Sequence, residues 1–246
     1  IMKIYKKILI LIFLNFAATS SYAETKDCFE NVNRAFFSFN QGLDKTIFKP
    51  IAKGYSHLPN FVQKGVRNVT SNISNTVTIP NHFLQGNFKN FANDGGRFLI
   101  NTTFGILGLF DPASKMGLKK IENEDYGQTL GVWGVGSGCY LMLPIFGPST
   151  GRDVVGKVAN TLLDPFYMTT VGNDKVLDNN FGDSTYYLEK GFDTVDSRSK
   201  NLKNFESLEK NSIDLYATVR SLYLQRRENL ISNNTSDQKD DWEKFK

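Results

Sequence analysis

The sequence predicts a mainly α-helical protein, and two observations carry this prediction. Apolar residues recur at spacings of three and four in several long segments, which is the period of an amphipathic helix. No segment of comparable length alternates apolar and polar residues, as a half-buried strand would. Residues 139–143 predict only one short strand.

The first expected helix runs over residues 31–43, where apolar side chains form a single stripe. A second begins after Pro59, a residue well placed to open a helix. A third stripe starts at Phe88. Because glycine costs about 1 kcal/mol inside a helix, the pair Gly95-Gly96 predicts a break there, or a close approach of two backbones.

Two more helices are expected towards the end of the chain. One covers residues 154–162 and ends before Asp164-Pro165, since the residue before a proline disfavours the helical conformation. The last has Ser212 as its expected N-cap, with Arg226 and Arg227 near its negative end.

The uncharged segment 98–110 raises the question of which solvent the helices face. As a helix it would be about 20 Å long, against about 30 Å for the hydrocarbon core of a bilayer. It could enter one leaflet, or it could be a core helix of a soluble protein. The chain has 20 phenylalanines, and adjacent ones such as Phe36 and Phe37 widen a helix's apolar face, which favours lipid contact. The candidate membrane-facing residues are Phe36, Phe37, Phe98, Phe104, Leu107 and Phe110.

Glycines and prolines interrupt the apolar segment 126–149 every few residues, so no long helix or regular strand fits it. Irregular backbone needs partners in packed protein or in a watery cavity. This segment is therefore a candidate wall for a passage, with Gln128, Trp133, Gly134 and Gly136 as candidate lining residues.

Two polar groups admit a structural and a functional interpretation. Arg152 either pairs with Asp153 to order a loop, or faces a passage where its guanidinium meets a lipid phosphate. Asn101, Thr102 and Thr103 either bond the local backbone or line such a passage. The sequence does not separate these alternatives.

The ends of the chain predict processing and a flexible tail. Residues 1–23 have three lysines, an apolar run and Ser21-Tyr22-Ala23, the pattern of a cleaved secretory signal. Residues 24–230 are expected to form one domain, and the polar residues 231–246 a disordered tail. Without residues 1–23, 26 basic residues stand against 25 acidic ones, which argues against nucleic-acid binding.

No pattern of catalytic residues points to an enzyme, and none predicts a cofactor or a metal site. The two histidines, His57 and His82, each lie near a proline in a turn-like setting and are expected to be solvated. Two alternatives stay open beside lipid transport. They are a periplasmic or surface protein with a structural or assembly role, and a lipid-modifying hydrolase.

Short motifs follow one another in an order that resembles the MlaA (VacJ) family of outer-membrane phospholipid-transport proteins, from about Asp27 to about Leu230. They are Asn33-Arg34, Phe39-Asn40, Leu43-Asp44, Lys49-Pro50, Leu84-Gln85-Gly86, Arg97-Phe98, residues 101–105, Gly127-Gln128-Thr129-Leu130-Gly131, Trp133-Gly134-Val135, Leu143-Pro144, Gly147-Pro148-Ser149 with Arg152-Asp153, Asp196-Ser197-Arg198 and residues 223–227.

The resemblance implies a ring of helices in the inner leaflet of a Gram-negative outer membrane, at its periplasmic face. This ring would surround an amphipathic channel that takes misplaced phospholipids from the outer leaflet. It implies a trimeric porin and a periplasmic lipid carrier as partners, and neither a cofactor nor catalysis.

The chain departs from this family at both of its cysteines, where the family usually has proline. Many members carry an acylated cysteine at the mature N-terminus, but Asp27 immediately before Cys28 argues against acylation. In an oxidising compartment Cys28 and Cys139 could pair. The alternative is that both are small buried apolar residues.

Overall fold

The computed structural model describes residues 25–171 and 179–232. The predicted signal peptide lies outside these residues, as does the predicted tail beyond Ser232. As predicted, the described part is mainly helical. Its elements are α2 (Glu30–Leu43), η1 (Asp44–Phe48), α3 (Lys49–Ser56), α4 (Asn60–Leu84), α5 (Phe88–Thr103), α6 (Pro112–Lys115), α7 (Tyr126–Val132), β1 (Tyr140–Leu143), β2 (Gly147–Thr150), α8 (Gly151–Leu162), α9 (Pro165–Thr170), α10 (Asn179–Lys200), α11 (Leu202–Asn211) and α12 (Leu215–Ile231).

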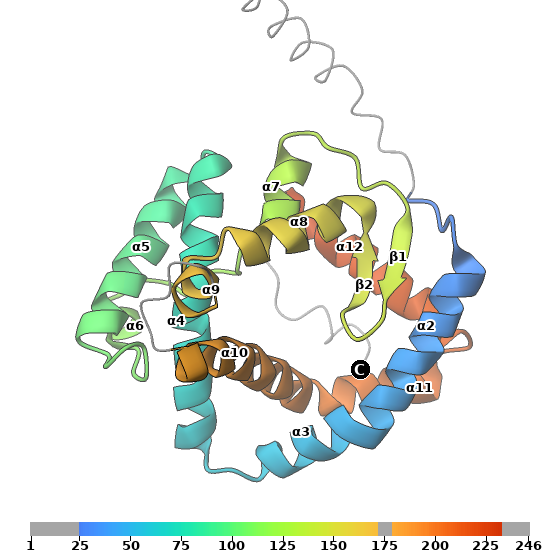
Figure 1. The fold of residues 1–246 in the computed structure, drawn as a ribbon, viewed down its shortest axis with the longest axis horizontal. Coiled ribbons are helices and arrows are strands. Elements are labelled where there is room, and N and C mark those ends of the chain that lie inside the picture. The colour runs from blue at the N-terminus through green and yellow to red at the C-terminus, as the bar shows by residue number, and fades with distance from the viewer. Residues whose placement is uncertain (1–24, 172–178, 233–246) are drawn as a thin grey trace, which may run out of the picture.

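The helices are arranged as a ring (Figure 1). The chain passes from α2 at the right through η1 and α3 at the bottom to α4 and α5 at the left. The β1–β2 hairpin, α8 with α9, and α10 border the middle of the ring. The hairpin is antiparallel and pairs Tyr140 with Thr150. In the described part of the chain, no helix combines the length and apolar character needed to cross a membrane.

The break predicted at Gly95-Gly96 is wrong. α5 continues through Gly95 and Gly96, and the 98–110 segment is helical only as far as Thr103. Leu118 lies against Gly96, where an added Cβ would stand 3.4 Å from the Leu118 Cδ1. The N-cap of α8 is Thr150, whose Oγ1 accepts from the Asp153 amide.

The last helix also starts differently from expectation, because Asp214 rather than Ser212 caps α12 and accepts from the Ala217 amide. His82, expected in a solvated turn, lies in the last turn of α4 and is fully buried. Its Nε2 is 3.1 Å from Asp94 Oδ2. Pro80 is accommodated inside α4, which continues to Leu84.

Arginine–aspartate pairs join elements that are far apart in the sequence. The pairs are Arg34–Asp214, Arg67–Asp196, Arg97–Asp111, Arg198–Asp44 and Arg227 with Asp125 and Asp153. Bidentate guanidinium–carboxylate contacts fix geometry as well as adding energy. The apolar core is small, and Tyr140, Met142 and Tyr216 form its described cluster.

Candidate functional site

Polarity is inverted in several helices, with polar side chains buried and apolar ones exposed. On α2, Asn33 is buried while Val32 and Phe36 are exposed. On α5, Asp94 and Arg97 are buried while Phe88, Phe91 and Leu99 are exposed. A helix in water normally turns its apolar stripe to the core. On α2 and α5, therefore, the apolar side chains are exposed on the protein surface.

The inversion holds for the described chain as a whole. Nine apolar side chains are buried there against twenty polar or charged ones. Thirty-three large apolar side chains are exposed in this part of the chain. Where such side chains form contiguous patches, they mark contacts with lipid, ligands or other proteins. Buried polar groups keep hydrogen bonds, as where the Asn33 side chain bonds the Tyr140 carbonyl and the Met142 amide.

A compact apolar turn follows α5 and is built by its own backbone. The Gly108 amide donates to the Asn101 carbonyl and the Phe110 amide to the Gly105 carbonyl. Phe104 is 79% exposed and Leu107 71%. Leu107 has a φ of 54°, which a branched apolar residue adopts rarely. The fold thus holds large apolar side chains outward at this turn.

The second apolar surface lies on α8, which borders the middle of the ring (Figure 1). Val155, Val158 and Leu162 are 60%, 54% and 57% exposed and follow helical spacing. The opposite side of α8 packs on α7, where Gly156 lies against Gly127. The packed face of α8 is therefore its small and polar face.

The β1–β2 turn adds a third exposed apolar group. Ile145 and Phe146 are exposed at its tip, and Ile145 has a φ of 68°. Asn40 on α2 holds this turn: its amide donates to the Leu143 carbonyl and its Oδ1 accepts from the Ile145 amide. Two side-chain bonds therefore fix the position of the apolar tip.

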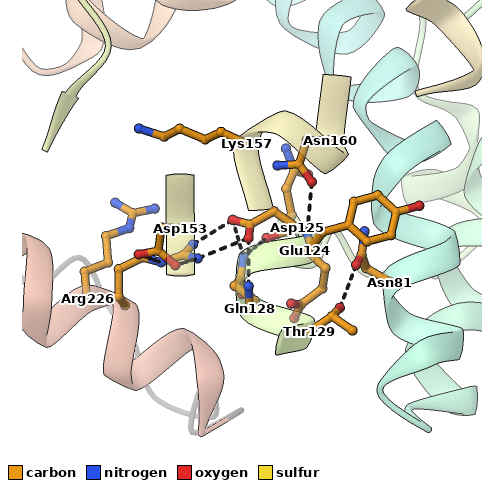
Figure 2. Close-up of polar contacts among 12 residues, drawn as sticks. Asn81, Glu124, Asp125, Gln128, Thr129, Asp153, Lys157, Asn160 and Arg226 are labelled. Carbon is orange, nitrogen blue, oxygen red and sulfur yellow. Dashed lines mark hydrogen bonds and ion pairs between the residues drawn. The ribbon is translucent and has the colours of Figure 1, made fainter. Parts of the chain in front are cut away.

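Behind α8, a buried polar cluster joins α7, α8 and α12, as drawn in part in Figure 2. Arg227 donates to both oxygens of Asp125, at 2.6 and 3.1 Å, and to both oxygens of Asp153, at 2.7 and 3.1 Å. The Tyr223 hydroxyl donates to Asp153 at 2.6 Å. Asp125 also caps α7 by accepting from the Gln128 amide. One guanidinium thus fixes three helices.

Burial by itself would raise the pKa of both carboxyls in this cluster. The hydrogen bonds and charge of Arg227 outweigh that effect and hold the pKa of Asp125 and of Asp153 below the usual range. Burial, with the charge of Asp153, raises the pKa of Tyr223. Each group therefore keeps its ordinary charge at neutral pH, as a structural cluster requires.

The structure places Arg152 at the edge of this cluster. Its guanidinium lies 3.3 Å from Asp153 Oδ1 and donates to the Val135 carbonyl at 3.2 Å. Its side chain is nearly buried, so its contacts are those of the pairing interpretation. Asp153 is buried, and its carboxylate oxygens accept hydrogen bonds from Arg227, Arg152 and Tyr223.

The polar candidates on α5 also bond within the protein. Asn101 donates to Asp111 at 3.0 Å and accepts from the Ala113 amide. Thr102 accepts from Asn72, and Thr103 donates to the Leu99 carbonyl. These contacts order the turn after α5.

Among the candidates of the glycine-rich segment, Gln128 is buried and donates to Asn123 and Asp125. Trp133 is exposed, and its Nε1 donates to the Leu84 carbonyl. Gly134 has a φ of 88°, so it needs glycine's freedom, whereas Gly136 has neither a positive φ nor a close neighbour.

The candidate membrane-facing residues divide into two groups. Phe36, Phe104, Leu107 and Phe110 are exposed. Phe37 instead packs edge-on against Tyr216 at a centroid distance of 5.5 Å, so the expectation that it faces lipid is wrong. Phe98 is only partly exposed.

Cys28 and Cys139 form a disulfide, with Cα atoms 5.6 Å apart. The bridge fastens the segment before α2 to the start of β1. The Tyr140 amide donates to the Lys26 carbonyl, and Asn33 donates to Asp27. A sulfur in this bond carries no acyl group. Among the described residues, no group of three or more His, Cys, Asp or Glu side chains could hold a metal ion.

Known proteins share this sequence and this fold. The model of the MlaA lipoprotein family matches residues 25–230. A Haemophilus influenzae protein named intermembrane phospholipid transport system lipoprotein MlaA is 33% identical over 211 residues, covering 84% of this chain and 80% of that protein. The Escherichia coli protein of the same name is 32% identical over 209 residues, covering 82% and 77%.

An uncharacterized Rickettsia bellii protein is 36% identical over 213 residues, covering 83% of this chain and 76% of that protein. A solved structure described as "Structural basis for maintenance of bacterial outer membrane lipid asymmetry" matches with a TM-score of 0.72 and 31% identity. That match covers 84% of this chain and 99% of the solved one. The resemblance drawn from the motifs is confirmed, and the chain belongs to the MlaA lipoprotein family.

Proposed function

We propose that this protein transports phospholipid between the outer and inner membranes, removing misplaced phospholipids from the outer leaflet of the outer membrane and so maintaining lipid asymmetry. Relatives named as intermembrane phospholipid transport lipoproteins, 32–33% identical over most of the chain, support this assignment. So does the solved structure concerned with outer-membrane lipid asymmetry.

The observation that carries the proposal is that two of the three exposed apolar groups lie on different parts of the ring. One lies on the rim, at the turn of Phe104 and Leu107. The other is the α8 stripe of Val155, Val158 and Leu162, on an element at the middle of the ring. A rim surface is suited to surrounding lipid, whereas an inner stripe is suited to acyl chains in transit. A structural or assembly protein needs only the first surface.

The ring sits in the inner leaflet at the periplasmic face of the outer membrane, with its rim in the acyl region. A trimeric porin and a periplasmic lipid carrier are its partners in this proposal, as the family resemblance implies. No covalent bond changes during transport, so the protein needs neither a general base nor a cofactor.

The test is co-purification from mild detergent followed by lipid mass spectrometry. We expect phospholipid in the wild-type protein. Val158→Asn with Leu162→Asn should lose most of it, because the stripe would no longer shield acyl chains from water. The control is Ile213→Asn, a single exposed apolar residue between α11 and α12. Absence of phospholipid from the wild-type protein would refute the proposal.

A further inference from the structure

A large polar cavity lies apart from the apolar surfaces. It opens between α4, the segment 117–123, the later part of α10 and the end of α12, and its volume is about 1080 Å³. That is close to the size of small-molecule sites, on the order of 300–1,000 Å³. Apart from a glycine, only Ile121 and Leu230 among its lining residues are apolar. The cavity is therefore suited to a headgroup and not to acyl chains.

The lining of the cavity is positively charged. Seven lysine and arginine residues face four acidic residues there. The chain after residue 23 is nearly balanced, with 26 basic against 25 acidic residues. The excess of positive charge is thus concentrated in one hollow, where such charge attracts anions most effectively.

Arg226 and Arg227 pair with acidic residues, but internal pairing does not neutralise the other cations of the lining. Asp196 alone accepts from Arg67, at 2.9 and 3.0 Å, and from Lys200, at 3.2 Å. The ammonium of Lys120 makes neither an ion pair nor a hydrogen bond to any residue that the structure describes. One carboxylate therefore balances two cations, and a third has no partner.

The surroundings of Lys120 change the pKa of its ammonium. Its side chain is exposed to the cavity, yet the enclosing protein lowers the pKa of its ammonium. Desolvation is the main cause, and the charges of Lys200 and Arg97 add to it, whereas Asp111 opposes it. The positive charges of Lys200 and Arg97, which disfavour this ammonium, are favourable for an anion bound beside it.

We propose that this cavity binds the phosphate group of an anionic phospholipid headgroup through Lys120, Lys200 and Arg67. Lysine and arginine donors are the usual partners of phosphate oxygens. The net positive lining favours a headgroup with a net negative charge over a zwitterionic one. This inference rests on the proposed function and adds to it a headgroup site and a preference for anionic lipid.

The test measures binding of short-chain lipids to the full-length protein in mild detergent by isothermal titration calorimetry. The probes are monomeric dihexanoylphosphatidylglycerol, dihexanoylphosphatidylcholine and inorganic phosphate. We expect phosphatidylglycerol to bind more tightly than either of the others. Lys120→Gln should weaken that binding about tenfold, through loss of a charge-assisted contact, and Lys120→Arg should retain it.

The matched control is Lys203→Gln on α11, which removes the same charge from an exposed position outside the cavity. It should bind the lipid as the wild type does. Circular dichroism and the melting temperature establish that each variant is folded. Lys200→Gln is a second variant that should also weaken phosphatidylglycerol binding.

Wild-type affinity for phosphatidylglycerol in both Lys120→Gln and Lys200→Gln would overturn the inference. Equal affinity for phosphatidylcholine would overturn the headgroup preference. Inorganic phosphate binding as tightly as phosphatidylglycerol would identify a free-anion site and overturn the lipid assignment. Lipid co-purification decides the proposed function separately, because phospholipid retained by a protein that fails these tests leaves transport intact.

Discussion

Gly156 of α8 lies against Gly127 of α7 with no room for a side chain between the two helices. A Cβ at position 156 would come within 2.5 Å of the Gly127 Cα, and the obstructing atoms belong to backbone. Backbone cannot move aside as a flexible side chain can. This contact sets the position of α8, and through it the position of the apolar stripe at the middle of the ring.

Gly156→Ala should therefore lower the free energy of unfolding by about 1–3 kcal/mol, the usual cost of overpacking. The control is Gly54→Ala on α3, where an added Cβ meets nothing within 4 Å. That change should be neutral or stabilising by up to about 1 kcal/mol. Urea unfolding in detergent measures both. Equal stability of the two variants would contradict the close approach.

Arg227→Gln should destabilise the protein by about 3 kcal/mol at pH 7, because it leaves two buried carboxylates without their cation. Because the pKa values of Asp125 and Asp153 are depressed, these groups stabilise the wild type above the ordinary carboxyl pKa of 3.8, and this contribution is lost as the pH falls through the folded pKa values. In the variant, acid instead relieves the repulsion between the carboxylates. The difference in stability between the two proteins should therefore shrink from pH 7 towards pH 4.

Arg226→Gln is the matched control, since Arg226 is exposed and lies 3.5 Å from an exposed Glu122. Exposed pairs contribute at most about 1 kcal/mol. Thermal unfolding across this pH range measures all three proteins. A difference in stability between wild type and Arg227→Gln that does not change with pH would show that Arg227 does not act through the two carboxylates.

The apolar turn after α5 should contribute to membrane attachment. Phe104→Gln with Leu107→Asn removes two exposed apolar side chains, each worth about 1.5–3 kcal/mol when fully buried. Asparagine tolerates the positive φ of position 107, so the turn should persist. Flotation with phospholipid vesicles should show at least tenfold weaker association. Ile213→Asn should bind as the wild type does. Unchanged flotation of the double variant would remove this turn from the membrane contact.

Removing the disulfide should weaken the fold without abolishing it. Cys28→Ala with Cys139→Ala opens a loop with a sequence separation of 111, and native disulfides typically contribute about 2–4 kcal/mol. The Asp27 contacts with Asn33 and Tyr216 still hold the segment before α2. Reductant should lower the melting temperature of the wild type and leave the double variant unchanged. A wild type insensitive to reductant, with two alkylated thiols, would mean that the bridge does not form.

The sequence predicted the helical class, the α2 stripe and the short strand β1, because local periodicity and breakers set these features. It offered the pairing of Arg152 with Asp153 as one of two alternatives. It did not reveal that Asp153 and Asp125 share Arg227, since the partners lie 74 and 102 residues apart in the chain. A single sequence carries no signal for such distant pairing.

The wrong predictions also have physical causes. Gly95 and Gly96 stay helical because neighbouring packing outweighs their low propensity, and Leu118 fills the space beside Gly96. Phe37 lies on the α2 side that faces Tyr216, so its adjacency to Phe36 did not decide its surroundings. His82 is buried because Asp94 on α5 supplies its partner across the α4–α5 contact. Each outcome depends on tertiary neighbours.

The central claim is that this protein removes phospholipid from the outer surface of the outer membrane. The direct measurement is the fraction of phosphatidylethanolamine that a membrane-impermeant amine reagent labels on intact Gram-negative cells lacking their own MlaA-family protein. Expression of this chain should lower that fraction, whereas the Val158→Asn, Leu162→Asn variant at equal abundance in the membrane should not. Labelling that stays unchanged with the wild-type protein present in the outer membrane would contradict the account.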